Sequence, residues 1–229
     1  MSLGLQADGK VIGWGQILNS LGLSNSFGPT VPSHATNVVA VAAGPHHALA
    51  LQANGRVLAW GRDSTHTNVP SAANRPDNGV VAIGSGEYQS FAIRTNGTLI
   101  AWGKWPTVPL AFSNVVQAVS GRNHSLALRA DGTVVKWTAG ATRLVPPDVT
   151  NIVAIAAHGD NSAALRADGR VLVWGDNSVG QTNVPGSLTN ALALAMGGSH
   201  GVAVVGAGTS GGWTTNSIAR LVFAHAGQT

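Results

Sequence analysis

The chain contains no cysteine among its 229 residues. This absence excludes disulfide bonds, thiolate metal sites and a cysteine nucleophile. It leaves the compartment open, because a cysteine-free chain suits both oxidising and reducing surroundings. Repeat sequence begins directly after Met1 without a recognisable signal peptide, as in a fragment or a chain lacking its export signal. We expect an extracellular or cell-surface location if the chain is part of a longer exported bacterial protein, and a cytoplasmic one otherwise.

Charged and aromatic residues are also scarce. Asp, Glu, Lys and Arg make up 10% of the chain and Phe, Trp and Tyr 5%, whereas apolar residues make up 44%. These proportions exclude a disordered chain and a coiled coil. No apolar run approaches the roughly 20 residues of a membrane span. The net charge of +4 comes without a run of basic residues, so the sequence does not predict a nucleic-acid partner.

No catalytic, cofactor or metal motif is recognisable. P-loop, nucleophile-elbow, zinc-protease and calcium-loop patterns are missing, and the glycine-rich stretch 204–212 is not followed by an amphipathic helix with an acidic residue. Glu87 is the only glutamate, and His46-His47 is the only adjacent histidine pair. We therefore predict that the protein is not an enzyme and holds neither cofactor nor metal.

The sequence does contain a thirteen-residue phrase written five times. It reads SLGLQADGKVIGW at its first occurrence and SAALRADGRVLVW at its last. The tryptophans that end the phrase are 46, 42, 35 and 37 residues apart, and a period of this size indicates a repeat architecture. They are Trp14, Trp60, Trp102, Trp137 and Trp174.

Each full repeat predicts three short antiparallel strands. In the unit 151–185 the apolar runs are 152–157, 162–166 and 170–174, which we call strands A, B and C. Runs of four to six aliphatic residues bounded by Gly, Asn, Asp and Pro are typical of strands. An Asp-Gly or Asn-Gly pair joins B to C every time and predicts a type I′ turn with two residues at positive φ. The glycines of these pairs are Gly9, Gly55, Gly97, Gly132 and Gly169.

A small sheet of this kind has two apolar faces to cover. Arranged radially, neighbouring sheets cover each other, and the Trp at the end of strand C is suited to filling the space between them. A stacked β-solenoid is the alternative, but its period would be tighter. We therefore predict an all-β fold, a β-propeller.

The phrases VVAVAAGPHHALALQANGRVLAWG and WGDNSVGQTNVP resemble the repeats of the RCC1 family in a compact bacterial form. The resemblance covers roughly residues 2–205. It implies a β-propeller, commonly seven-bladed, that mostly binds proteins. Some eukaryotic members are guanine-nucleotide exchange factors that bind chromatin, and a bacterial relative inhibits β-lactamases with one propeller face.

The chain is too short for seven blades. The first repeat supplies strands B and C without A, and the last supplies A and B without a clear C. We expect five or six blades of three or four strands, or an incomplete ring, within residues 1–206. We expect residues 207–229 to form a separate tail, in which 217–225 is a candidate closing strand.

One histidine recurs just before strand B. His47, His124 and His200 hold this position, and Gln89 and Asn161 hold it in the remaining repeats. These amides form hydrogen bonds but are poor zinc ligands, so the shared property is hydrogen bonding at a turn. We predict a structural role for these histidines.

Binding is expected in the parts that do not repeat, because a rigid scaffold displays variable loops. The main hypothesis is a non-catalytic propeller that binds a protein through same-face A–B turns and loops between blades. The alternatives are a structural or surface-display module of a larger exported protein and, by family analogy, an exchange factor or nucleic-acid binder. The predicted contact residues are His46, Glu87, Tyr88, Trp105, Arg122, Asn123 and Asp160.

Overall fold

A computed structural model describes residues 2–15, 30–61, 64–104, 108, 112–138 and 141–206. The chain forms six antiparallel sheets, which we number in chain order. Sheet 1 contains β1 (Ser2–Leu5) and β2 (Val11–Trp14). Sheet 2 contains β3 (Val38–Ala43), β4 (His47–Gln52) and β5 (Val57–Gly61). Sheet 3 contains β6 (Val80–Ser85), β7 (Gln89–Arg94) and β8 (Leu99–Gly103).

The later sheets follow the same order. Sheet 4 contains β9 (Val115–Ser120), β10 (Ser125–Arg129), β11 (Val134–Thr138) and β12 (Ala141–Arg143). Sheet 5 contains β13 (Ile152–His158), β14 (Asn161–Arg166) and β15 (Val171–Trp174), and sheet 6 contains β16 (Ala191–Met196) and β17 (Gly201–Val205). The single turn of helix α1 (Ser64–Thr67) follows β5. The predicted all-β propeller architecture is therefore confirmed.

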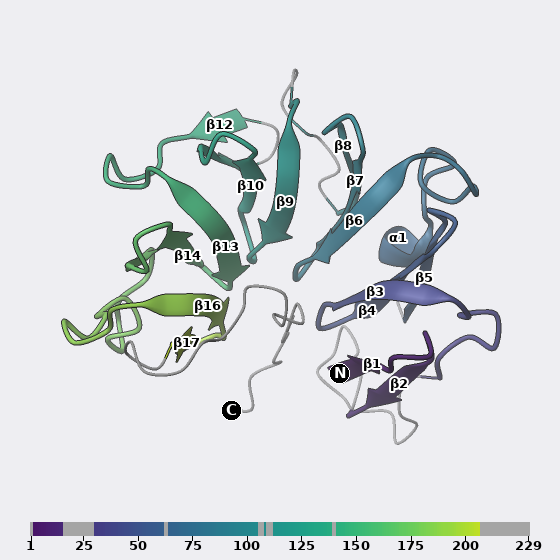
Figure 1. The fold of residues 1–229 in the computed structure, drawn as a ribbon, viewed down its shortest axis with the longest axis horizontal. Coiled ribbons are helices and arrows are strands. Elements are labelled where there is room, and N and C mark those ends of the chain that lie inside the picture. The colour runs from purple at the N-terminus through teal and green to yellow at the C-terminus, as the bar shows by residue number, and fades with distance from the viewer. Residues whose placement is uncertain are drawn as a thin grey trace.

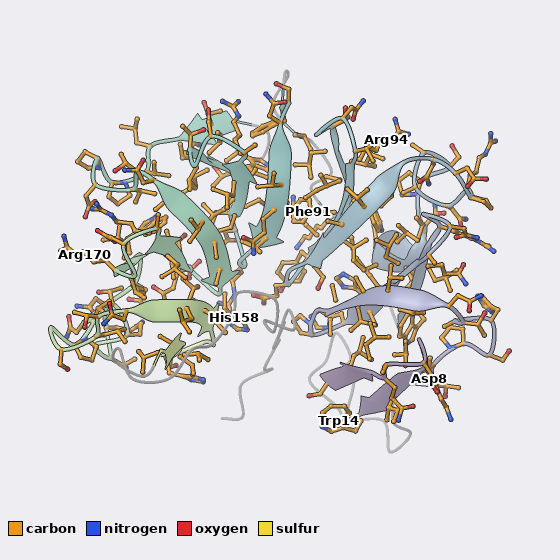
Figure 2. The ribbon with its side chains drawn as sticks, viewed as in Figure 1. Asp8, Trp14, Phe91, Arg94, His158 and Arg170 are labelled. Atoms are coloured by element: carbon orange, nitrogen blue, oxygen red, sulfur yellow. The ribbon has the colours of Figure 1, made fainter. Side chains whose placement is uncertain are left out.

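The six sheets follow one another around an arc, with sheets 1 and 6 at its two ends (Figure 1). The ends of β9, β13 and β16 point to the middle of the arc, so the A–B turns lie there. His158 lies near this middle, whereas Asp8, Arg94 and Arg170 at the B–C hairpins lie on the outer side (Figure 2). Within the described residues, sheet 1 consists of the B and C strands of its repeat and sheet 6 of the A and B strands.

The B–C hairpins are not the predicted type I′ turns. Gly9 has φ 79° and bonds to Gln6 O at 3.0 Å, but Asp8 is not among the residues at positive φ. The loop is the three-residue type in which only the last residue is left-handed. The Asp8 carboxylate instead accepts the Lys10 N–H at 3.0 Å, and Asn54, Asn96, Asp131 and Asp168 make the same contact. Asp and Asn alternate there because both carry this acceptor.

The hairpins also join each sheet to the next, through the carbonyl of the hairpin glycine in sheets 1, 3, 4 and 5 and through that of Asn54 in sheet 2. The carbonyl of Gly132 accepts the N–H of Ile152, which begins β13, at 3.1 Å, and the carbonyl of Gly169 accepts that of Ala191 at 3.0 Å. An asparagine at positive φ, such as Asn151 at 55°, sets the start of the A strand against the hairpin. An outer row of backbone bonds therefore holds successive sheets together.

Apolar clusters fill the space between sheets. Trp137 of sheet 4 lies in a cluster with Phe91 and Leu99 of sheet 3, and the two aromatic rings meet edge to face at 6.0 Å. Trp60 and Trp102 are buried in the same way against sheets 1 and 2, and the half-buried Trp174 packs against sheet 4. Trp14 departs from this pattern and is 54% exposed, because no described sheet precedes sheet 1.

Sheet 4 differs from its neighbours in having a fourth strand. In sheets 2, 3 and 5 a glycine at positive φ follows the Trp, as in Gly103 at 117°. Thr138 holds this position in sheet 4, and a β-branched residue resists such a backbone. Thr138 ends β11 and pairs with Ala141 of β12.

Candidate functional site

The A–B turns of successive sheets lie directly against each other in the middle of the arc. In sheets 2, 3, 4 and 6 the turn begins with a glycine whose N–H donates to the carbonyl oxygen three residues later, as Gly121 N does to His124 O at 2.9 Å, whereas His158 holds this position in sheet 5. A Cβ at Gly121 would collide with the carbonyl oxygen of Gly159 in the next turn. Arg122 N also donates to Gly159 O at 2.6 Å. Only glycine permits this close approach of two backbones.

Three side-chain contacts connect the turns of four sheets. The His46 and Tyr88 rings stack at 6.0 Å between sheets 2 and 3. Arg122 Nε lies 3.4 Å from Glu87 Oε1 between sheets 3 and 4. Asn123 Nδ2 donates to Asp160 Oδ1 at 3.3 Å between sheets 4 and 5. The structure thus brings six of the seven predicted contact residues into one line, which we call the turn row. Trp105 lies outside the described residues.

Tyr88 lies at the most densely charged point of the turn row. Lys104 Nζ lies 4.9 Å from the centre of its ring, a cation–π distance. Burial and the negative charge of Glu87 raise the pKa of the Tyr88 hydroxyl, so it is neutral at physiological pH. The Arg122 side chain is 57% exposed, whereas that of Glu87 is 15% exposed. The turn row therefore combines a partly buried aromatic ring with an exposed guanidinium and with the polar side chains of Asn123 and Asp160.

A second row of polar side chains lies buried beneath the turns. Ser90 Oγ and His47 Nε2 form a hydrogen bond of 2.9 Å, and Ser162 Oγ and His124 Nε2 one of 2.8 Å. Ser125 donates to Gln89 in the same way. In every case the residue just before the thirteen-residue phrase in one sheet contacts the first residue of that phrase in the next sheet. This arrangement accords with the structural role predicted for His47 and His124.

His124 is held neutral in this row. Its burial and the nearby positive charge of Lys136 lower its pKa from 6.5 to about 4. The neutral ring keeps one nitrogen as an acceptor, which a protonated ring would lose. The serines that complete these pairs were missed in the sequence, although Ser90, Ser125 and Ser162 stand at the same place in the repeated phrase.

The buried row stops at sheet 6. Asn161 is buried and its Oδ1 has no hydrogen-bond partner, because Gly201 stands where sheets 3, 4 and 5 have serine. His200, in the next equivalent position, is exposed rather than buried, since no described sheet follows sheet 6. His200 therefore lies in a different environment from His47 and His124.

We predict that Gly201→Ser stabilises the protein by about 1 kcal/mol, since a hydroxyl at this position would donate to the Asn161 acceptor. The new Cβ would lie 3.1 Å from Met196 Sδ, which is flexible enough to move. Gly201→Ala adds the same Cβ without the hydroxyl and serves as the control. Urea unfolding followed by circular dichroism measures the difference; equal stabilities of the Ser and Ala variants would contradict the assignment.

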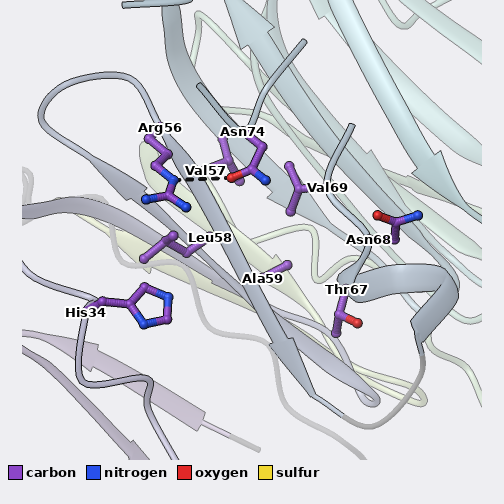
Figure 3. A pocket seen from close by; sticks show the side chains of 9 residues that line it. All are labelled: His34, Arg56, Val57, Leu58, Ala59, Thr67, Asn68, Val69 and Asn74. Atoms are coloured by element: carbon purple, nitrogen blue, oxygen red, sulfur yellow. Dashed lines mark hydrogen bonds between the residues drawn. The ribbon is translucent and has the colours of Figure 1, made fainter. Parts of the chain in front are cut away.

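Several arginines of the outer hairpins contact other groups of the same chain. Arg94 donates to Ala72 O at 3.0 Å, Arg166 pairs with Asp168 at 3.1 Å, and Arg129 lies over Phe112 at 5.9 Å. Figure 3 shows a hollow at the hairpin of sheet 2, where Arg56 Nε donates to Asn74 Oδ1 at 3.2 Å beside His34. None of the predicted contact residues lines this hollow.

Among the residues that the structure describes, no three His, Cys, Asp or Glu side chains are placed to hold a metal ion. No helix in this part of the chain has the length and apolarity to cross a membrane.

The repeated sheets and their inter-sheet contacts define a β-propeller assembled from repeats. The model of the regulator of chromosome condensation (RCC1) repeat matches residues 38–66 and 152–181. The chain therefore contains RCC1 repeats, as the resemblance in the sequence implied. No curated protein matches the chain. Its predicted bacterial origin stays a prediction.

Solved structures support the same fold. Prp20p from Saccharomyces cerevisiae, whose binding to Gsp1p and histones has been described, aligns with TM-score 0.69 and 19% identity over 88% of this chain and 65% of that one. Yeast RCC1 (Prp20) bound to Kap60 aligns with TM-score 0.66 and 22% identity over 88% and 63%. Human WBSCR16 aligns with TM-score 0.59 and 16% identity over 79% and 62%. This chain thus spans less than two thirds of the length of each structure.

Proposed function

We propose that this protein is a non-catalytic scaffold that binds a protein partner through the turn row. The observation that carries this proposal is the set of contacts at His46–Tyr88, Glu87–Arg122 and Asn123–Asp160. These contacts make one surface from turns whose residues differ from sheet to sheet. A rigid scaffold below and variable side chains above are the usual arrangement of a recognition surface.

The energetic centre of this surface is expected at Tyr88 and Arg122. Tyrosine and arginine are enriched among the residues that contribute most to protein interfaces. Both are preorganised here, Tyr88 by His46 and Lys104 and Arg122 by Glu87, so less conformational entropy is lost on binding. The protein binding described for Prp20 is consistent with this use of the fold.

We expect Tyr88→Ala and Arg122→Ala each to weaken partner binding at least tenfold, equivalent to about 1.4 kcal/mol or more. Affinity capture with quantitative mass spectrometry would identify proteins retained by the wild type, and titration calorimetry would measure each candidate. Arg170→Ala is the matched control, because Arg170 is an exposed arginine on the outer side of the arc. A partner retained equally by all variants would show that the turn row does not bind it.

A further inference from the structure

The hollow at the hairpin of sheet 2 is polar and small. Its volume is about 200 Å³. Pockets that hold drug-sized ligands have roughly 300–1,000 Å³, so a molecule that fits this hollow is smaller than these ligands. Figure 3 shows Arg56 and His34 at one end of the hollow and Thr67 and Asn68 at the other. Residues 57–59 of β5 line it between these two ends.

Hydrogen bonds to the backbone hold the walls of the hollow in place. Val57 N in β5 donates to Ala73 O at 2.9 Å, which fixes the wall that contains Asn74 against this strand. Gln52 Nε2 in β4 donates to His34 O at 3.2 Å and ties a second wall to the same sheet. A site with fixed walls loses little conformational entropy when a ligand binds.

Arg56 brings a positive charge to the hollow that no neighbouring carboxylate balances. Its half-buried side chain donates from Nε to Asn74 Oδ1 at 3.2 Å. None of the residues that line the hollow is acidic, and no carboxylate of the described residues lies within 4 Å of the guanidinium. Arg166 differs in this respect, because it pairs with Asp168 at 3.1 Å. Asn74 thus orients the Arg56 guanidinium while its terminal nitrogens stay available to a ligand.

The groups at the two ends of the hollow define the chemistry of a ligand. The terminal nitrogens of a guanidinium form a planar fork that matches the oxygens of a carboxylate or a phosphate. His34 adds a ring N–H at this end. At the other end, the Thr67 hydroxyl and the Asn68 amide both donate and accept hydrogen bonds, as a ligand with hydroxyl groups requires.

We propose that this hollow binds a small organic oxyanion, a carboxylate or phosphate monoester that carries hydroxyl groups. The oxyanion contacts Arg56 and His34, and the hydroxyl groups contact Thr67 and Asn68. This binding is separate from protein binding by the turn row, because no residue of the turn row lines the hollow.

Titration of the full chain with glycerol 1-phosphate and with glycerate, followed by NMR of the backbone amides, tests the proposal. Both molecules carry hydroxyl groups, one with a phosphate and the other with a carboxylate, and glycerol is the neutral control. We expect at least one anion to bind saturably and to shift the amide signals of the sheet 2 hairpin, and glycerol to leave them unchanged. The tighter-binding anion identifies the oxyanion that the hollow prefers. A wild type that binds neither anion saturably would overturn the proposal.

Arg56→Gln removes the positive charge and is expected to weaken anion binding at least tenfold. Arg170→Gln is the matched control, because Arg170 directly precedes β15 as Arg56 directly precedes β5, but it is exposed and does not line the hollow. Circular dichroism would check that the variants remain folded. Equal affinities of the wild type and Arg56→Gln would overturn the proposal.

Asn68→Ala tests the second end of the hollow. We expect it to weaken binding of glycerol 1-phosphate several-fold and to leave binding of inorganic phosphate unchanged, because inorganic phosphate has no hydroxyl-bearing carbon chain to reach Asn68. Unchanged affinity for both anions would show that Asn68 does not contact the ligand and would contradict the proposed orientation.

Discussion

Replacement of Trp137 by alanine is expected to lower the free energy of unfolding by about 3–5 kcal/mol. Trp137 is 1% exposed and contacts the Phe91 ring at 6.0 Å and the Phe112 ring at 5.1 Å. Its removal leaves a cavity between sheets 3 and 4, in the middle of the array, where both neighbouring sheets depend on this contact. Urea unfolding followed by circular dichroism is the suitable measurement, because the substitution changes the tryptophan fluorescence.

Trp14→Ala provides the matched control for this experiment. The residue holds the same position in the repeat, but its ring is 54% exposed. In dilute solution we expect this change to cost about 1 kcal/mol or less. Equal losses for the two variants would show that the tryptophans do not stabilise the fold by packing between sheets.

Acidification from pH 6.5 to pH 4 is expected to destabilise the protein through His124. The pKa of this histidine is lowered to about 4 in the folded state, whereas an unfolded histidine titrates near its usual 6.5. Between these values the unfolded chain binds a proton that the folded chain does not, so stability falls as pH falls. The full effect is about 3 kcal/mol at pH 4, and stability is restored above pH 6.5.

His124→Gln tests whether this residue is the cause. Glutamine is the natural occupant of the position in sheet 3, where Gln89 accepts a hydrogen bond from Ser125, so the variant retains an acceptor for Ser162. We expect its stability to vary less between pH 6.5 and pH 4 than that of the wild type. His34→Gln, at an exposed histidine, is the control. An unchanged pH dependence in His124→Gln would refute the assignment.

The turn row could be predicted only in part. The variable A–B turns were recognisable because they interrupt a repeated phrase, and this reasoning selected Tyr88, Arg122 and Asp160. Their pairing across sheets was not recognisable, because His46 and Tyr88 are 42 positions apart and meet only when two sheets are placed side by side. The turn type was predicted wrongly, since Asp-Gly also suits a loop in which only the glycine is left-handed.

The sequence by itself determined the repeat, its strands, the propeller class and the positions of the turns between strands. These features depend on the local alternation of apolar and polar residues and on turn chemistry. Only the tertiary structure decided which equivalent residues share an environment. Trp137 is buried and Trp14 is exposed, although both hold the same position in the repeat. His124 is buried and His200 is exposed, although these two histidines also hold equivalent positions. The physical reason is that burial depends on the presence of a neighbouring sheet, which the residues of one repeat do not encode.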